Sequence, residues 1–272
     1  MGQASENKMP EGDTIFRSAA KLGQSLEGCV IREATTTSLT LQTDSLIGQT
    51  IVNIAARGKH LLMHLSNTQI IHSHMGMTGS WHTYRRNHSW HKPASQAVLA
   101  LYFDNAVAVC YSPKLLELLT AAELKRHRWL ARLGPDLLAQ EFDVAEALTR
   151  FRRRNELPMG EAPMNQSIVS GIGNVYKSEL LYLDQTHPLT FVTDTSDETL
   201  TNIITRARKL LRRNVLGGPR RTRFRGDGHT LWVYGRQGEP CLKCGAMIHL
   251  TRQGDLGRTT YFCPSCQVLE RH

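Results

Sequence analysis

Two short stretches, Cys241-Leu242-Lys243-Cys244 and Cys263-Pro264-Ser265-Cys266, decide the structure of the C-terminal part of this 272-residue chain. The cysteines of each pair are two residues apart, and 18 residues separate the pairs. Thiolates at this spacing are typical of a tetrahedral Zn²⁺ site rather than of disulfides. Because cysteines fill all four positions, no coordination position is left open for catalysis. We therefore predict one structural Zn²⁺ that stabilises a β-hairpin within residues 231–272.

A helical region precedes the cysteines. Apolar residues recur at helical spacing in the ranges 143–151, 174–183 and 197–213. Asp143 is a suitable N-cap for the first helix, and Pro163–Ser170 is predicted to form a further short helix with its proline in the first turn. Gly171-Ile172-Gly173 then breaks the helical pattern before Asn174. This break is either a tight turn between two helices or a place where free N–H groups bind an anion such as a phosphate.

Residues 30–111 have the pattern of antiparallel β structure. Strands are predicted at 49–54, 61–65, 69–74, 97–103 and 106–111. Asn67-Thr68 and Asp104-Asn105 read as the turns of two hairpins. The length of this region suits a two-layer sandwich.

Around Pro113 the pattern returns to helix, and a helix at 121–133 ends at the stop signal Gly134-Pro135. We take this signal as a domain boundary. The prediction is an α+β multidomain chain. Its parts are an N-terminal extension (1–8), an antiparallel β-sandwich domain flanked by helices (9–133), a helical domain (134–230) and the zinc-finger hairpin (231–272).

Net charge indicates a polyanionic partner. The chain has 33 Lys and Arg against 24 Asp and Glu, a net charge of +9. The excess is concentrated in two clusters, at 150–154 and 206–225. A solvated basic face without a partner is the alternative. The sequence has no P-loop, which argues against an NTPase. It also has no secretion signal and no apolar run long enough to span a membrane, so we expect an intracellular protein, cytoplasmic and nucleoid-associated in a bacterium.

The stretch Met9-Pro10-Glu11-Gly12 has a possible chemical role. Removal of Met9 would make Pro10 an N-terminal amine. An α-amino group has a pKa about 2–3 units below that of lysine, so near neutral pH more of it is the free base, a nucleophile that can form a Schiff base. Glu11 would then be in reach to transfer protons. The alternative is a proline in a turn or in the first turn of a helix.

Two further features have alternative interpretations. Lys59, in the turn Arg57-Gly58-Lys59, is either a surface charge or a contact to a phosphate or to a reacting sugar. His72 and His74 lie on the same face of a predicted strand, so a second metal site is conceivable. The sequence places no carboxylate or cysteine beside them, which argues against that site.

Five separate motifs resemble those of the formamidopyrimidine-DNA glycosylase/endonuclease VIII family. They are Pro10-Glu11-Gly12, Arg57-Gly58-Lys59, His74-Met75-Gly76-Met77, Ser170–Asn174 and the four cysteines with Arg258. Their order and spacing match along nearly the whole chain from Met9 to Gln267. The start Pro-Glu-Gly-Asp-Thr is similar to the endonuclease VIII branch.

The resemblance implies a bifunctional DNA glycosylase/AP lyase of base excision repair, with a β-sandwich, a helix–two-turn–helix domain and a zinc finger. It would act as a monomer on damaged double-stranded DNA and remove oxidised bases, more readily pyrimidines. Pro10 would be the nucleophile at C1′ and Glu11 the proton donor and acceptor. Lys59 would assist base release and β-elimination.

The remaining roles that the resemblance implies concern DNA contacts. Asn174 and Arg258 would bind the phosphates around the lesion, and Arg258 would also aid δ-elimination. Arg132 matches a DNA-contacting arginine. Met77 matches a side chain that fills the gap left by the flipped base.

Two departures from the family pattern leave alternatives open. Eight residues precede Met9, and while they remain attached Pro10 has an amide nitrogen instead of an amine. Either the chain starts at Met9 and loses it, or the protein is a non-catalytic zinc-containing DNA binder. We expect the first, because a binder has no need of Glu11 beside an amine. Gly76 stands where some relatives have a side chain that reads the opposite strand, so a preference for oxidised purines is a further alternative.

Overall fold

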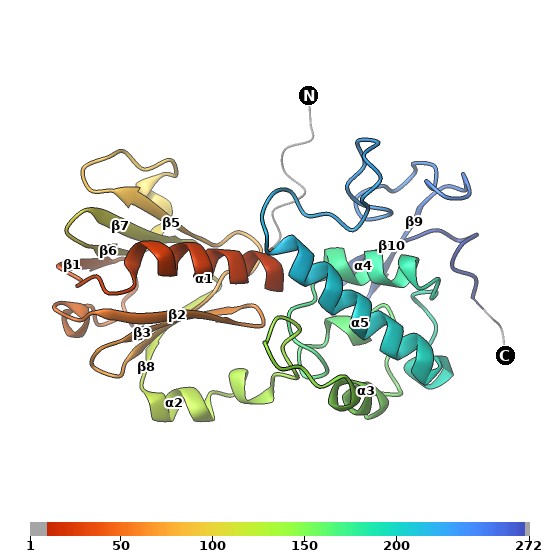
Figure 1. The fold of residues 1–272 in the computed structure, drawn as a ribbon, viewed down its shortest axis with the longest axis horizontal. Coiled ribbons are helices and arrows are strands. Elements are labelled where there is room, and N and C mark those ends of the chain that lie inside the picture. The colour runs from red at the N-terminus through yellow and green to blue at the C-terminus, as the bar shows by residue number, and fades with distance from the viewer. Residues whose placement is uncertain (1–9, 270–272) are drawn as a thin grey trace. The chain divides into compact units, whose positions relative to one another are not determined.

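The computed structural model describes residues 10–269 in two compact units (Figure 1). Of the described residues, Pro10 and 14–131 form the sandwich unit, and 11–13 together with 132–269 form the helical unit. The predicted extension 1–8 and Met9 lie outside the described residues. The domain boundaries predicted after 133 and 230 stay predictions.

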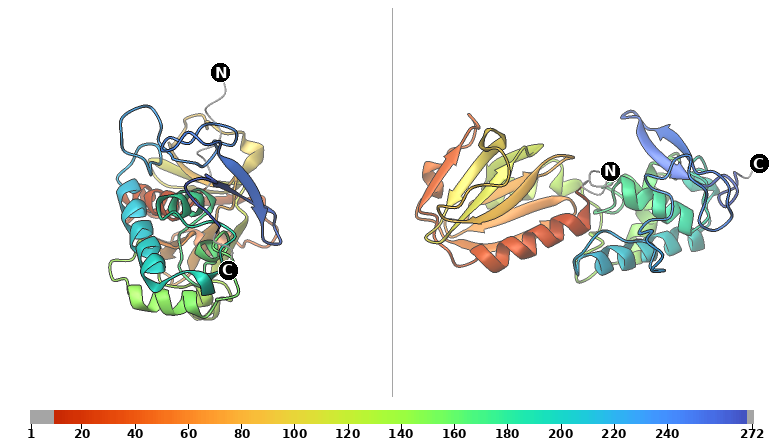
Figure 2. Two further views of the ribbon diagram at one scale, coloured as in Figure 1. Left: turned by 90° about the vertical axis from the view of Figure 1, so that its right-hand side faces the viewer. Right: turned by 90° about the horizontal axis from the view of Figure 1, so that it is seen from above.

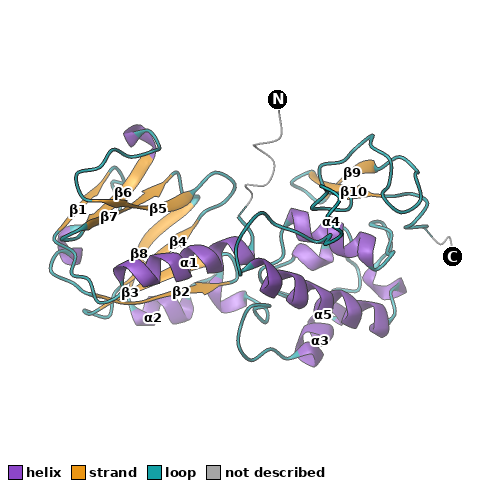
Figure 3. Cartoon of the chain, turned by 45° about the horizontal axis from the view of Figure 1, so that its top comes forward, coloured by secondary structure: helices purple, strands orange, loops and turns teal. Residues whose placement is uncertain are grey.

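The sandwich unit has two antiparallel sheets of four strands each (Figure 3). One sheet has the order β1-β6-β7-β5 and the other has the order β2-β3-β4-β8. The strands are β1 (Glu33–Thr36), β2 (Ile51–Arg57), β3 (His60–Leu65), β4 (Ile70–His74), β5 (Ser80–Arg85), β6 (Ala97–Tyr102), β7 (Ala106–Tyr111) and β8 (Leu115–Leu119). The antiparallel two-layer prediction is therefore confirmed.

One apolar core holds the two sheets and helix α1 (Gly12–Leu26) together. Ile15, Leu22 and Leu26 recur on one face of α1 and are almost completely buried against residues of both sheets, such as Met63 and Leu99. This spacing of three to four residues is what gives a helix a single apolar face. The first turn of α1 belongs to the helical unit, and its remaining turns belong to the sandwich unit.

The helix predicted around Pro113 is wrong. Leu115–Leu119 forms β8, which pairs with β4 through Ile70↔Leu119 and His72↔Glu117. A run of five residues that contains four leucines suits a strand as well as a helix, so periodicity alone does not distinguish them. Helix α2 (Ala121–Arg126) starts only at the capping box of Thr120 and Glu123, and it ends before a 3₁₀ turn, η4 (Leu130–Arg132).

The helical unit is built on three α-helices: α3 (Val144–Arg152), α4 (Asn174–Leu183) and α5 (Asp197–Asn214). Asp143 caps α3 as predicted, accepting hydrogen bonds from the N–H groups of Ala145 and Glu146. The helix predicted at Pro163–Ser170 is wrong, because only the 3₁₀ turn η5 (Ala162–Met164) forms there. Asn165 ends the turn by accepting hydrogen bonds from the backbone and hydroxyl groups of Ser167.

The C-terminal hairpin consists of β9 (His249–Gln253) and β10 (Arg258–Phe262), and it packs against α4 (Figure 2). Helix α4 is buried on nearly every side, from Val175 to Tyr182. Short 3₁₀ turns complete the list of elements: η2 (Asp44–Leu46), η3 (Ala94–Gln96) and η6 (Val192–Asp194). The fold class is α+β, as predicted. Among the described residues, no helix has the length and apolar character needed to cross a bilayer.

Candidate functional site

Glu11 is fixed at the N-terminus of α4. Its side chain is 1% exposed, and its carboxylate accepts hydrogen bonds from the N–H groups of Gly173 (2.7 Å), Val175 (2.8 Å) and Tyr176 (3.4 Å). The first N–H groups of a helix have no partner within the helix and carry partial positive charge. The anion that occupies this helix start is therefore a side chain of the protein. Of the two alternatives for the break at 171–173, the N–H groups do hold an anion, but it is the Glu11 carboxylate rather than a phosphate.

A buried ion pair braces the same region. Arg220 is 3% exposed and Asp13 is fully buried. The guanidinium of Arg220 donates two hydrogen bonds to the Asp13 carboxylate, at 2.7 and 3.0 Å, and the hydroxyl of Tyr176 donates a third at 3.0 Å. One nitrogen of Arg220 also lies 3.7 Å from Glu11. This bidentate geometry holds the first turn of α1 against α4.

Close backbone packing surrounds Glu11. The N–H of Gly12 donates to the carbonyl of Gly171 at 2.8 Å. A Cβ at Gly173 would collide with the Glu11 side chain, lying 2.5 Å from its Cγ and 2.8 Å from Oε1. Gly173 has an extended backbone (φ −124°) that any residue adopts, so its small size is what the structure requires. Pro10, half-buried, is joined to Glu11 by one peptide bond.

Asn174 and Arg258 are brought together in the helical unit. Asn174 is the first residue of α4, and its Nδ2 donates to the hydroxyl of Thr259 at 3.1 Å. Arg258 precedes Thr259 as the exposed first residue of β10. The Oδ1 atom of Asn174 is buried and has no hydrogen-bond partner in the described part of the chain. Arg132 is exposed at the end of η4.

Lys59 and Met77 belong to the sandwich unit. Lys59 lies in the turn between β2 and β3 and is half-buried, so part of its side chain contacts solvent. Met77 is 72% exposed, in the turn that follows β4. Gly76 has φ +64°, and a Cβ there would also lie 2.8 Å from the Cβ of Lys114. The left-handed conformation therefore favours glycine at position 76.

A chain of hydrogen-bonded side chains begins at His60, the residue after Lys59. His60 Nδ1 and His72 Nε2 are 2.8 Å apart, and His72 Nδ1 is 2.7 Å from Glu117 Oε1. His127 Nε2 lies 2.8 Å from the same oxygen. The carboxylate that the sequence analysis did not find beside His72 thus comes from β8. His74 packs beside His60, with ring centroids 4.8 Å apart.

The distances in this cluster fit hydrogen bonds better than metal coordination. Two ligands of a tetrahedral ion bound at about 2.0–2.1 Å lie more than 3 Å apart, which is longer than the separations at Glu117. His127 Nδ1 also accepts from the N–H of Leu130 at 3.4 Å, so its Nε2 carries the proton that Glu117 accepts. Burial, followed by the charge of neighbouring histidines, lowers the pKa of His60 to about 2. We therefore assign a hydrogen-bonded chain, with His60 neutral, rather than a metal site here.

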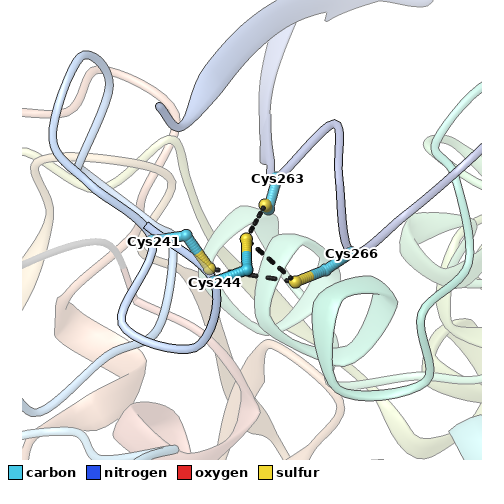
Figure 4. Close-up of side chains that lie close together, drawn as sticks. All are labelled: Cys241, Cys244, Cys263 and Cys266. Carbon is cyan, nitrogen blue, oxygen red and sulfur yellow. Dashed lines mark hydrogen bonds between the residues drawn. The ribbon is translucent and has the colours of Figure 1, made fainter. Parts of the chain in front are cut away.

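The four cysteines converge as predicted (Figure 4). The Sγ atoms of Cys241 and Cys266 are 3.9 Å apart, and Cys244 lies 3.4 Å from Cys263 and 3.5 Å from Cys266. Four thiolates at about 2.3 Å from a tetrahedral Zn²⁺ are separated by about 3.8 Å, so the donor set fits this ion. The hydroxyl of Tyr182, on α4, lies 3.3 Å from Cys241 Sγ and ties the cluster to the helix.

Much of the arginine excess is used inside the protein. Arg152 donates to Asp197 and to two backbone carbonyls, and Arg206 pairs with Asp184. Arg208 donates to the carbonyl of Leu137. The two basic clusters are therefore partly structural, which the charge count could not show.

Sequence reasoning missed several buried polar residues of this region. They are Asp13 as an ion-pair partner, Tyr176, Lys177, Glu179 and Arg220. Glu179 is fully buried and accepts from the N–H groups of Trp232, Val233 and Tyr234, so it fixes the segment before the zinc finger. Helical periodicity gives no sign of such positions, because α4 is buried on nearly all sides.

Three family models match the chain in sequence order. The formamidopyrimidine-DNA glycosylase N-terminal domain matches residues 9–114, and the H2TH domain of the same glycosylase matches 133–225. The zinc finger found in FPG and IleRS matches 238–268. Together they cover more than half of the chain.

Curated relatives and solved structures agree with these matches. The chain is 37% identical to a probable endonuclease 8 2 of Streptomyces coelicolor, covering 96% of this chain and 94% of the relative. It is 34% identical to the DNA-(apurinic or apyrimidinic site) lyase Nei2 of Mycolicibacterium smegmatis, covering 96% and 99%. A complex of Lactococcus lactis Fpg with abasic-site DNA is similar in fold, with a TM-score of 0.81 at 22% identity, covering 95% of this chain and all of that one.

Proposed function

Because this chain belongs to the formamidopyrimidine-DNA glycosylase/endonuclease VIII family, we propose that it is a base-excision-repair enzyme that uses Pro10 as its nucleophile and acts mainly on oxidised pyrimidines. Family membership makes it a DNA glycosylase/AP lyase. The nucleophile, the roles of the other site residues and the lesion class are the finer proposals. The observation that carries the proposed chemistry is the Glu11 carboxylate held on the start of α4, one residue after Pro10.

Pro10 starts the reaction as a free N-terminal amine. Its nitrogen forms a bond to C1′ of the damaged nucleotide while the C1′–base bond breaks, and the base leaves with a proton. The amine nitrogen loses its proton, the C1′–O4′ bond breaks and O4′ takes up a proton, so the opened sugar is joined to Pro10 as an iminium that acidifies C2′. Loss of a C2′ proton then expels the 3′ phosphate, and a second elimination expels the 5′ phosphate. Water finally releases the amine from the sugar fragment.

Glu11 is the group placed to move these protons. Three backbone N–H groups hold its carboxylate in one orientation. A proton-transfer group held in place beside its substrate contributes typically 10²–10⁴-fold to a rate. Because main-chain groups do the holding, no side-chain rearrangement is needed before the reaction.

The other residues bind the substrate. Asn174 and Arg258 would hold the phosphates next to the lesion, with Arg258 assisting the second elimination. Lys59 would assist base release and the first elimination. Met77 would enter the stack where the flipped nucleotide leaves, as exposed apolar side chains do in other base-flipping proteins. Arg132 would contact the DNA backbone. We propose that the protein acts as a monomer on double-stranded DNA.

Zinc has a structural role in this proposal. Cys241, Cys244, Cys263 and Cys266 would hold one Zn²⁺, which stabilises the hairpin that carries Arg258. With four thiolate ligands the site has no position for a substrate.

The proposed preference for pyrimidines rests on the relatives. The two curated relatives named endonuclease 8 2 or Nei2 are 37% and 34% identical to this chain, whereas a formamidopyrimidine-DNA glycosylase of Heliobacterium modesticaldum is 30% identical. The start Pro10–Thr14 is also of the endonuclease VIII kind. Excision rates on duplexes with thymine glycol, dihydrouracil or 8-oxoguanine test this preference. A faster rate on 8-oxoguanine would reverse it.

Borohydride trapping tests the nucleophile. Protein that starts at Met9, and has lost it, should form a reducible covalent adduct with abasic-site DNA. The matched control keeps residues 1–9, so it has every side chain but an amide at Pro10. It should bind the same duplex and form no adduct. Peptide mapping should place the adduct on Pro10. An adduct at another residue would refute Pro10 as the nucleophile, and no adduct with the processed protein would favour the non-catalytic DNA binder.

A further inference from the structure

Lys177 is a buried amine that the proposed mechanism does not use. It lies one turn after Asn174 in α4, and its side chain is fully buried. Its Nζ donates to the carbonyl of Thr259 at 3.0 Å and to the hydroxyl of Thr260 at 2.8 Å. Both acceptors are neutral, and burying an ammonium against neutral partners is costly. The cost of burying Lys177 suggests that its amine has a role in the site.

The hydrogen bonds of Lys177 help to fix the position of Arg258 relative to Asn174, the two residues proposed to bind phosphate. Thr259 is the residue after Arg258, and its hydroxyl accepts from Asn174. The hydroxyl of Thr260 donates onward to Gln253, on β9, at 2.7 Å. The start of β10 is thus attached to the first two turns of α4 by Asn174 and Lys177 together. Loss of the amine would remove two of the hydrogen bonds that fix Arg258 relative to Asn174, leaving the bond from Asn174 to Thr259.

The charges around Lys177 are nearly balanced. Arg258, on β10, repels its positive charge, whereas Glu11, before α1, and Glu161, before η5, attract it. Burial, followed by the charge of Arg258, lowers the pKa of Lys177 to about 7. In the free protein the amine is therefore close to the midpoint of its titration at neutral pH. A change in the charge beside Arg258 would alter its protonation.

We propose that Lys177 is a positioning residue of the phosphate site, and that it takes up a proton when a DNA phosphate binds beside Arg258. The inference rests on the proposed function, which places a phosphate at Asn174 and Arg258. A phosphodiester there adds negative charge and offsets the repulsion by Arg258. The protonated amine then holds Thr259 and Thr260 with the strength of a charged donor. Tight binding and a rigid site form together.

The proton makes the inference testable through binding alone. A rise of one unit in the pKa of Lys177 on binding weakens the affinity by up to about tenfold as the pH rises through the window between the two values. The ligand is a duplex with a tetrahydrofuran abasic analogue, which the enzyme cannot cleave. Its dissociation constant is measured between pH 6.5 and 9 at fixed salt. Every other titratable group is the same in all variants, so differences between variants isolate Lys177.

Two substitutions and one control complete the design. Lys177→Met keeps the volume without the amine, and Lys177→Arg keeps a charge throughout this pH range. In both variants the fold-change in the dissociation constant between pH 6.5 and 9 should be about tenfold smaller than in the wild type. Lys125→Met removes one exposed charge from α2 and should follow the wild type. Zinc content and thermal midpoint verify that each variant is folded.

Calorimetry provides a second readout. Binding enthalpies in Hepes and Tris buffers at pH 7.5 should differ by the number of protons taken up multiplied by the difference in the ionisation enthalpies of the two buffers, and Lys177→Met should reduce that difference. Tight binding with no proton uptake, or uptake unchanged in Lys177→Met, would overturn the inference and leave the proposed function intact. Failure of the wild type to bind this duplex would refute the proposed function itself.

Discussion

Substitution of Gly173 by alanine tests whether the backbone grip on Glu11 sets the reaction rate. The new Cβ would lie 2.5 Å from Glu11 Cγ and 2.8 Å from Oε1, where ordinary contacts are about 3.5–4.0 Å. The extended backbone of Gly173 does not disfavour alanine, and its place as the N-cap of α4, where alanine is less favourable than glycine, affects the stability of the helix. The carboxylate therefore has to move by about 1 Å, and a misplacement of that size costs roughly 100-fold in rate.

Single-turnover excision on a lesion duplex is the appropriate assay, because it reports chemistry apart from product release. Gly173→Ala should lower this rate by roughly 100-fold. Its affinity for a tetrahydrofuran duplex should change by less than about tenfold, since Asn174 and Arg258 are untouched. Zinc content and thermal midpoint serve as checks that the helical unit is folded.

A double-mutant cycle separates displacement of Glu11 from general damage. Glu11→Gln keeps the shape of the side chain, removes the group that exchanges protons and should itself cost about 10²–10⁴-fold. If Gly173→Ala acts only through Glu11, the combined variant should be little slower than Glu11→Gln alone. Independent effects that multiply, or a Gly173→Ala enzyme with the wild-type rate, would refute this account of the site.

Three further predictions concern stability and the metal. Chelation, or Cys244→Ser, should remove one zinc per chain and abolish DNA binding, measured by metal analysis and a gel-shift titration. Asp13→Ala should leave Arg220 buried without its carboxylate and cost about 3–5 kcal/mol in urea denaturation. His60, with its pKa lowered to about 2, and His74, with its pKa lowered to about 4, stay neutral in the fold while the unfolded chain gains protons below pH 6.5. The free energy of unfolding from urea titration should therefore fall between pH 7 and pH 5, by up to about 2 kcal/mol for each histidine.

Local patterns predicted the elements that local forces determine. The predicted ranges 174–183 and 106–111 are observed as α4 and β7. In both cases residues close in sequence, a glycine break before the helix and a polar turn before the strand, determine where the element begins. The zinc ligands were predictable for the same reason, since their spacing sets the chemistry. By contrast, β5 was missed because its sequence, Ser-Trp-His-Thr-Tyr-Arg, has only Trp81 and Tyr84 buried.

The arrangement of the site depends on contacts between residues far apart in the sequence, which local patterns do not predict. Asp13 and Arg220 are 207 residues apart, and nothing in the basic cluster distinguishes a buried arginine from an exposed one. Likewise, Glu117 joins His72 only because Leu115–Leu119 is a strand beside β4. An error about one element therefore hid the partner that explains the histidines.

The way Glu11 is held has a consequence for lesion choice. Its three donors are main-chain N–H groups of Gly173, Val175 and Tyr176, so the position of the carboxylate is insensitive to most side-chain changes nearby. An enzyme built in this way can keep one chemical step while it varies the base that it accepts. Selectivity must then arise from residues that meet the bases. In this chain the exposed Met77 follows Gly76, whose left-handed backbone favours glycine, so position 76 has no side chain with which to read the opposite strand.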